Sequence, residues 1–481
     1  MSPLETPVFP SKGVHTDTSP LSLQDYAVTS NGFLPEEPPL RRLPDPYYAP
    51  WESLVETLST SIAEQTLRQQ VDQLPVLSTD RLTTEPEWRR ACVVLAFLTH
   101  GYIWGGETAA EILPPPLTTP LLTITTHLGM PPVATYACVN LWNFHQQHPL
   151  NTTSPASPAS PSPPSAPTNL DALTALHTFT GTPDESWFYM VSVAMEARGA
   201  YLVPAMLRTL EAATSARVGK CGAEVVADGL GELAAGIGEL GGLLDRMDER
   251  CDPMVFYHRI RPFLAGSKNM AAAGLPRGVF YDGGEGVGEW RQLRGGSNGQ
   301  SSLVQFLDVV LGVEHKAMGN SSPDSVASSA KVGGESFHQE VRRYMPEPHR
   351  RFLEDVAVRY PGGMRKAVGD LVADGTGGSK EELMAVREAF EGATRALAEF
   401  RNKHLQMVTR YIIIPSRQPN PNQGVNLATA SSRLTGTGAP EGRRPAPTAG
   451  GELTGTGGTA LLPFLKQSRD ETFQAGQLRV R

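Results

Sequence analysis

One histidine occupies an unexpected position in FRNKHLQMVTRYIIIPS, residues 400–416. Apolar residues recur every three or four positions here, and His404 takes a position where that pattern calls for an apolar side chain. A lone histidine on an apolar helix face is most often a core residue hydrogen-bonded to a neighbour. Alternatively, its neutral imidazole could bind a metal or a haem iron, and a single histidine fits one axial ligand better than a multi-histidine cage. The periodicity is compatible with both interpretations.

Other local signatures of chemistry are absent or weak. The sequence has no G-x-S-x-G nucleophile elbow, no H-E-x-x-H zinc motif and no P-loop. GIGELG, residues 236–241, matches the dinucleotide pattern G-x-G-x-x-G, but it lies inside a helical apolar stripe instead of following a strand. We therefore interpret it as a chance match. His145 and His148 border a low-complexity segment, and a solvated loop is the simpler interpretation of that pair.

The histidine segment ends a long predicted helix. Ser379 and Glu382 form a capping-box pattern at its start, and Pro415 is expected to end it. At about 1.5 Å per residue, such a helix is about 45 Å long, enough to span a domain. The residues expected along its inner face are Leu383, Val386, Phe390, Ala393, Leu397, Phe400, His404, Met407 and Tyr411.

Similar patterns predict a mainly α-helical fold. A second apolar stripe runs through residues 226–247. The polar glycine loop RGGSNGQSS, residues 294–302, precedes another helical segment, for which Ser301 or Ser302 is available as the N-cap. Strand signals are few.

The whole chain has 481 residues, 40% of them hydrophobic, and a formal net charge of −8. This is enough apolar material for a large core in two domains. The mild acidity, without a basic stripe, argues against a nucleic-acid partner. No apolar run reaches the ~18 residues of a membrane span, and the first residues lack the pattern of a secretory signal. The four cysteines form no CxxC pair, so we expect free thiols and a cytoplasmic location.

Composition divides the chain into parts. Residues 1–50 are predicted to be an extended N-terminal segment, and residues 51–150 a small helical N-terminal domain. Residues 151–170 form a Pro/Ser/Ala-rich linker or insertion that cannot pack a core. Residues 171–481 are predicted to be a large helical domain, in which 417–459 form a flexible loop.

Several segments, taken in order, resemble the fungal-type indoleamine 2,3-dioxygenases, which are haem enzymes. The resemblance covers most of the chain outside the N-terminal segment and two loop insertions. It implies a mainly α, two-domain helical haem dioxygenase fold, with a smaller N-terminal domain and a large all-α C-terminal haem domain. The segments that carry it are HLGMPPVATYACVNLWN (127–143), FYMVS (188–192), FYHRIRPFLAGSK (256–268), GGSNGQSSLVQFLDVVLG (295–312), YMPEPHRRFL (344–353), HLQMVTRYIIIP (404–415) and GTGGT (455–459).

The resemblance also implies roles around a haem b cofactor. Residues implied to lie next to it are His404 as the iron ligand, Arg401 near a haem propionate, Gly296, Ser297 and Asn298 in a loop over the haem edge, and Asp308 in the nearby polar network. Asn298 is larger than the residue expected at its position, which predicts a tighter or more polar pocket over the haem.

A second set of residues is implied to contact the substrate. They are Tyr136 in the inner pocket, Phe188 and Phe256 as aromatic walls, Ser192 as a tuning residue beside the indole, Arg261 for the substrate carboxylate, Ser297 in the loop, and Thr456 on a mobile closing loop. We expect Ser192, Phe256 and Arg261 to matter most for catalysis. An arginine fork binds a planar carboxylate bidentately, and phenylalanines give an indole apolar and edge-to-face contacts.

Taken singly, these residues have simpler explanations. Phe188 and Phe256 would be ordinary core residues, and Arg261 a surface or salt-bridged residue. Asp308 alone would be a solvated helix face, and Thr456 an ordinary turn residue. Only their joint order within one family pattern favours the functional interpretation.

The activity implied by the resemblance is cleavage of the indole C2–C3 bond of L-tryptophan with O₂ to give N-formyl-L-kynurenine, the first step of the kynurenine route to NAD. An external reductant must first reduce the haem, and we expect a monomer with no membrane partner. Two alternatives stay open. One is a haem or O₂-binding protein of the same fold with little or no turnover, and the other is a haem-free helical scaffold.

Overall fold

The structure is a computed structural model, and it describes residues 21–147, 167–215, 219–316, 336–375, 378–418 and 461–478. Helices dominate these residues, and the few strands are each two to six residues long. The prediction of a mainly α-helical fold is therefore confirmed. His148, Thr456 and most of the two predicted loop segments lie outside the described residues.

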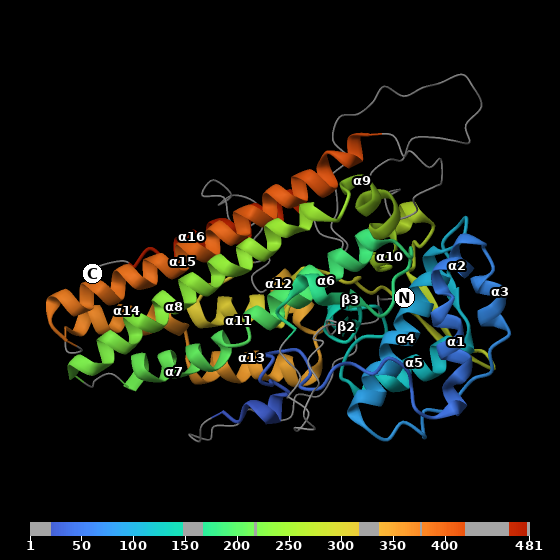
Figure 1. Cartoon of the computed structure of the whole chain (residues 1–481), viewed down its shortest axis with the longest axis horizontal. Helices are drawn as coiled ribbons and strands as arrows, with labels where there is room; N and C mark the ends of the chain where they lie inside the picture. The colour runs from blue at the N-terminus through green and yellow to red at the C-terminus, as the bar shows by residue number, and fades with distance from the viewer. Residues whose placement is uncertain are drawn as a thin grey trace, which may run out of the picture.

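Five helices near the N-terminus form one end of the molecule (Figure 1, blue). α4 begins at a capping box made by Thr84 and Glu87 and is buried along most of its length, so it forms the centre of this group. The helices are α1 (Ala49–Glu56), α2 (Leu58–Ala63), α3 (Leu67–Asp72), α4 (Glu85–Trp104) and α5 (Pro115–His127).

Most of the remaining helices form an elongated bundle in which α15 packs along both α8 and α16, whereas the short helices α9 and α10 lie at its end, nearer the N-terminal helices (Figure 1). The remaining helices are α6 (Pro183–Arg198), α7 (Leu202–Ser215), α8 (Gly219–Asp245), α9 (Pro253–Val255), α10 (Arg261–Leu264), α11 (Ser302–Leu311), α12 (Phe337–Arg342), α13 (Glu347–Arg359), α14 (Gly363–Asp374), α15 (Lys380–Val408) and α16 (Leu461–Ala475).

The strands form two small sheets at the margin of the helices. In the first, β1 (Ile112–Leu113) pairs in parallel with β4 (Val279–Gly284), which pairs antiparallel with β5 (Val287–Arg291). In the second, β2 (Phe144–Gln146) pairs antiparallel with β3 (Leu173–Ala175). The second sheet joins the chain on the two sides of the Pro/Ser/Ala-rich segment.

α15 follows the sequence pattern closely. The Ser379 side chain accepts a hydrogen bond from the Glu382 N–H, and the Glu382 side chain accepts one from the Ser379 N–H, as the capping-box pattern predicted. The helix ends at Val408, however, and not just before Pro415. The chain continues as a π-helical turn, in which the Ile414 N–H donates to the carbonyl of Thr409, five residues earlier. Pro415 has no N–H to donate and its ring would clash with the carbonyl of an α-helical turn, which accounts for the wider turn before it.

The other helical predictions are confirmed. Leu230, Leu233 and Ile237 of the second apolar stripe are buried in α8, and the GIGELG segment lies inside this helix. There, a Cβ on Gly236 would approach Tyr201 and Leu202 to below 3.0 Å, so this glycine allows close helix packing. Ser301 is the N-cap of α11 and accepts a hydrogen bond from the Val304 N–H.

Two large apolar cores fill the molecule. The first joins residues from the N-terminal helices, α6 and the segment 256–293, and the second lies within the elongated bundle. Met195 and Met407 pack against both cores. Because the first core includes residues on both sides of the Pro/Ser/Ala-rich segment, it is shared across the predicted domain boundary. The division into domains stays a prediction.

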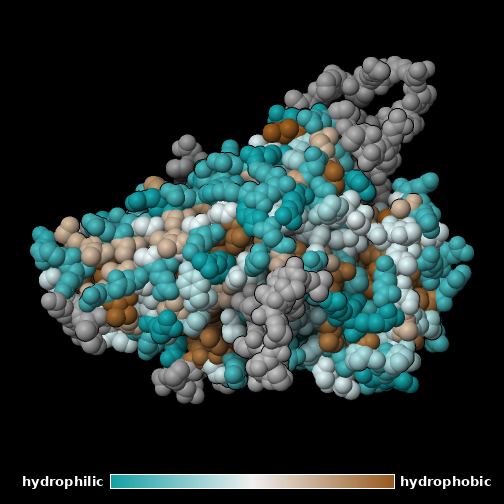
Figure 2. Space-filling view, viewed as in Figure 1, coloured by the Kyte–Doolittle hydropathy of each residue, from teal (hydrophilic) through white to brown (hydrophobic). Residues whose placement is uncertain are grey.

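The surface is mostly polar on the face that Figure 2 shows, where hydrophobic side chains appear in separate groups among hydrophilic ones. Such scattered apolar residues are normal for a protein surface. In the part of the chain that the structure describes, no helix is both long and apolar enough to cross a membrane.

A buried ion pair anchors the N-terminal helices. Arg90 Nη2 lies 2.5 Å from Glu52 Oε2, both side chains are 1% exposed, and Glu52 also accepts the Leu43 N–H. Arg90→Ala would leave the Glu52 carboxylate buried without its cation. We therefore expect a loss of about 3–5 kcal/mol in the free energy of unfolding, measured by urea denaturation.

The matched control for that change is Arg42→Ala. Arg42 pairs with Glu56 at 2.5 Å, but both side chains are about half exposed. Its removal should cost about 1 kcal/mol or less. Equal losses for the two variants would contradict the anchoring role of the buried pair.

Candidate active site

A cavity of about 230 Å³ lies where the two apolar cores meet, and Met195 and Met407 line it. One buried water needs only about 10–15 Å³, so the cavity has room for a large organic group. Most of its lining side chains are apolar. The predicted site residues that line it are Tyr136, Phe188, Ser192, Phe256, Arg261, Gly296, Ser297, Asn298, Arg401 and His404.

Three π-helical turns contribute to the cavity wall. They are η3 (Ala137–Leu141), η6 (Phe256–Ile260) and η9 (Thr409–Ile413), and each supplies at least one lining residue. π-Helical turns are rare and often occur at functional sites. None of these turns was predicted from the sequence.

His404 lies near the C-terminal end of α15 and faces the cavity. Its ring is half-buried because one side borders the cavity, and within the described residues neither ring nitrogen has a hydrogen-bond partner. Burial, aided by the positive charge of Arg401, lowers the pKa of His404 to about 4. The imidazole is therefore neutral at physiological pH, which is the form that binds a metal. This arrangement does not fit the hydrogen-bonded core histidine considered above.

Arg401, one helical turn before His404, is held by a polar network. Its Nη2 lies 2.6 and 2.7 Å from the two carboxylate oxygens of Asp308, and its Nη1 donates to the carbonyl of Ser468 on α16. Asp308 does not line the cavity, and it is buried, with only 3% of its surface exposed. Burial alone would raise the pKa of Asp308, yet Arg401 and His315 hold it well below its usual range. The isolated interpretation of Asp308 as a solvated helix face is therefore wrong.

Two aromatic rings form one wall. The rings of Phe188 on α6 and Phe256 in η6 lie 4.8 Å apart at 51°, and Tyr411 meets Phe256 edge-on at 5.7 Å. Ser192 follows Phe188 by four residues and lies on the same face of α6. The two phenylalanine rings provide flat apolar contact next to the hydroxyl group of Ser192.

Arg261 follows η6 and is 3% exposed. Its guanidinium carbon lies 5.6 Å from the centre of the Tyr257 ring, and burial lowers the pKa of Arg261. A guanidinium on a cavity wall is suited to bind a carboxylate group of a ligand. Of the two isolated interpretations of Arg261, a surface residue or a salt-bridged residue, burial contradicts the first.

The predicted glycine loop is tied to the inner pocket by Gln300. The Gln300 side chain accepts from the Tyr136 N–H at 2.8 Å and donates to the Gly295 carbonyl at 2.8 Å. A Cβ on Gly296 would lie 3.3 Å from the carbonyl oxygen of Ala134, so the loop passes close to its neighbour. Asn298 is exposed, and its predicted effect on the pocket is untested.

Glu196 is a cavity residue that the sequence analysis missed. It is 1% exposed, and its Oε1 accepts from Ser301 at 2.6 Å and from Tyr136 at 3.1 Å. Its Oε2 is buried and has no hydrogen-bond partner among the residues that the structure describes. Burial raises the pKa of Glu196 to about 7. The signal was its position four residues after Ser192, on the same helix face.

The family of the chain follows from comparison with known proteins. A family model described as indoleamine 2,3-dioxygenase matches residues 22–475. The chain belongs to the indoleamine 2,3-dioxygenase family. An indoleamine 2,3-dioxygenase of Saccharomyces cerevisiae is 38% identical over 464 residues, which are 95% of this chain and 94% of the relative.

Other relatives of the chain carry different names. A 6-hydroxytryptophan 2,3-dioxygenase of Fusarium equiseti is 35% identical, over 95% of this chain and 98% of the relative. A myoglobin of Haliotis madaka is 28% identical, over 95% of this chain and 99% of the relative. As an indoleamine 2,3-dioxygenase family member, the protein is a haem-dependent dioxygenase.

The cavity of this family member fits a haem. The neutral His404 imidazole borders it without a partner among the described residues and would bind the iron. Arg401 lines the cavity and would place its positive charge near a haem propionate, and the apolar walls suit the porphyrin ring. Bound there, the haem would supply the O₂ chemistry.

A prediction follows for Glu196. Its pKa is about 7 in the folded protein against 4.5 for a free glutamate, so the folded state holds a proton more tightly. Stability should therefore fall as pH rises from about 4.5 to 7, by about 3 kcal/mol in total. Glu196→Gln removes this penalty. We expect the variant to be more stable than the wild type at pH 8 and similar at pH 4.5, by urea denaturation; an equal difference at both pH values would contradict the prediction.

Proposed function

We propose that this family member cleaves the indole C2–C3 bond of L-tryptophan with O₂ and forms N-formyl-L-kynurenine. The observation that carries the proposal is the presence, on one cavity, of the His404 imidazole without a partner among the described residues, an aromatic pair and the buried Arg261 guanidinium. These are the groups that an iron, an indole ring and an amino-acid carboxylate require. The names of the relatives support the same reaction class.

The residues of the chain would bind and orient the substrate. Arg261 would bind its carboxylate through a charge-assisted, bidentate contact, which fixes one end of the molecule. Phe188 and Phe256 would contact the indole faces and keep water away from the reacting bond. Ser192 offers a hydroxyl for the indole N–H and acts as a tuning residue, not as a required base. Such positioning of the indole next to the iron site is the main contribution of the protein.

The direct test is turnover by haem-loaded protein with a reductant and O₂. We expect L-tryptophan to be converted to N-formylkynurenine, identified by mass spectrometry with both oxygen atoms derived from ¹⁸O₂. Protein that binds haem but gives no product from L-tryptophan would contradict the proposal.

Two alternatives have specific support. The relative named as a myoglobin matches 95% of this chain and 99% of its own length. Its name favours an O₂-binding protein without turnover as the second candidate function. Strong binding of CO to the reduced protein without any product would favour it. A relative named for 6-hydroxytryptophan makes that compound the second candidate substrate, and a higher kcat/KM for it than for L-tryptophan would change the substrate assignment.

A further inference from the structure

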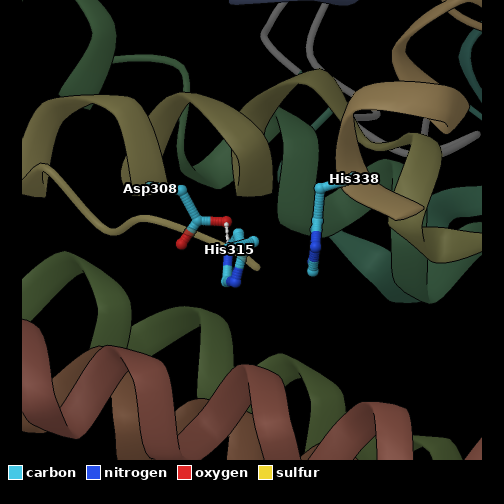
Figure 3. A group of neighbouring side chains, drawn as sticks. All are labelled: Asp308, His315 and His338. Carbon is cyan, nitrogen blue, oxygen red and sulfur yellow. Dashed lines mark hydrogen bonds and ion pairs between the residues drawn. The ribbon is translucent and has the colours of Figure 1, made fainter. Parts of the chain in front are cut away.

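A second group of possible ligands lies at the edge of the cavity, and one of its members, His338, lines the cavity. It consists of Asp308 on α11, His315 in the segment after that helix, and His338 at the start of α12 (Figure 3). One ligand atom from each residue lies within 4.8 Å of the others. We propose that Asp308, His315 and His338 bind a divalent transition-metal ion, such as Zn²⁺, at a site separate from the haem iron.

The donor set suits such an ion. Two imidazoles and one carboxylate are typical ligands of Zn²⁺ and of other first-row divalent ions. With bonds of about 2.0–2.1 Å in a tetrahedral site, the ligand atoms would lie about 3.4 Å apart. The group must therefore contract slightly, and a water molecule would complete the four ligands.

His315 is held by carboxylates at both ring nitrogens. Its Nδ1 lies 2.8 Å from Glu471 Oε2, and its Nε2 lies 3.1 Å from Asp308 Oδ2. When Nε2 binds the metal, the proton on that atom is released to solvent, and Nδ1–H keeps its bond to Glu471. A carboxylate that holds the outer nitrogen of a ligating histidine is a common feature of metal sites.

Glu471 is itself fixed in this role. Its Oε1 accepts the Lys316 N–H at 3.1 Å and the Gln467 side-chain N–H at 2.8 Å. Both contacts leave Oε2 directed at His315. The site would therefore tie α16 to α11 and α12.

His338 has the lone pair that the site requires. Its ring stacks on that of His315, with centroids 3.7 Å apart and planes at 16°, and lies 5.2 Å from the Phe464 ring. Its ring nitrogens make no hydrogen bond to the residues that the structure describes, so rotation out of the stack would break none. Burial, together with nearby positive charges, lowers the pKa of His338 well below its usual value, and the ring is neutral.

Arg401 is the main opposing charge. Its guanidinium contacts both oxygens of Asp308, but each carboxylate oxygen has two lone pairs, so Asp308 can bridge the guanidinium and a metal ion. With His315 neutral, the carboxylates of Asp308 and Glu471 face the guanidinium of Arg401 and the nearby positive charge of Arg342. The two negative charges therefore balance the two positive charges before a cation binds.

The test is a zinc count on the haem-loaded protein. Wild-type protein is dialysed against chelator-buffered Zn²⁺, and zinc and iron per chain are measured by mass spectrometry. We expect one tightly bound zinc in addition to the haem iron, with histidine nitrogens at about 2.0–2.1 Å in zinc-edge X-ray absorption. Absence of this zinc from the wild type would overturn the proposal.

The decisive variant is His338→Phe, which keeps an aromatic ring against His315 and removes both ligand nitrogens. Zinc affinity should fall at least tenfold in this variant. The control is His127→Phe, because His127 also stacks on an aromatic ring, at 4.2 Å from Trp88, and contacts the carboxylate of Glu85. Zinc retained by His338→Phe, or lost equally in the control, would overturn the site.

Discussion

Replacing His404 with alanine is expected to leave the protein without bound haem. The imidazole is neutral, borders the cavity and has no other partner among the described residues, so its removal takes away the proposed iron ligand without breaking a hydrogen bond. Loss of a residue that merely supports a ligand reduces metal affinity about 10–100-fold, and loss of the ligand itself should exceed this. The measurement is haem per chain after purification in the presence of excess haem.

A control separates ligand loss from misfolding. Added imidazole should enter the space left by the side chain and restore haem absorbance to His404→Ala. His100→Ala serves as the matched buried histidine, because His100 hydrogen-bonds to the Phe263 carbonyl and does not line the cavity. That variant should keep its haem. A normal haem spectrum in His404→Ala would refute the assignment of the iron ligand.

Replacing Arg261 with alanine is expected to lower kcat/KM for L-tryptophan by a factor of about 30 to several thousand. The change would remove one partner of the proposed buried charge pair with the substrate carboxylate, and such a loss costs about 2–5 kcal/mol. Arg261→Lys should recover only part of the loss, because an ammonium group cannot reproduce the bidentate contact. Steady-state kinetics over a range of tryptophan concentrations measure the effect.

Tryptamine is the matched control substrate, since it has the indole ring and amine of tryptophan but no carboxylate. Its binding, followed by the change in haem absorbance, should not weaken in Arg261→Ala. The variant should therefore lose the preference for tryptophan over tryptamine. If both compounds weakened equally, Arg261 would have a structural role and its assignment to the carboxylate would be wrong.

Local patterns in the sequence predicted the helices well because their signals lie within a few residues. The capping box at Ser379, the apolar faces of α8 and α15 and the N-cap at Ser301 were all visible in this way. Contacts between residues far apart in sequence were harder to predict. Phe188 and Phe256 touch across 68 positions, and only the family resemblance suggested that they share a pocket.

Burial of polar residues was the main failure of local reasoning. Asp308 and Arg261 appeared to be surface residues when taken singly, yet each is 3% exposed. The only local indication that Glu196 lines the cavity was its spacing of four residues from Ser192. His315 and His338 lie on either side of residues 317–335, so nothing in the local pattern indicated that their rings would stack.

The three π-helical turns have a consequence for how this pocket can diversify. Each contains one residue more than a regular α-helical turn at the same place. Loss of a single residue from η6 would restore the regular turn and rotate everything after it by about 100° about the helix axis. Arg261 directly follows η6, so one codon deletion would swing its guanidinium off the pocket wall. Changes in ligand preference among related proteins can thus arise from deletions as well as from exchanges of side chains.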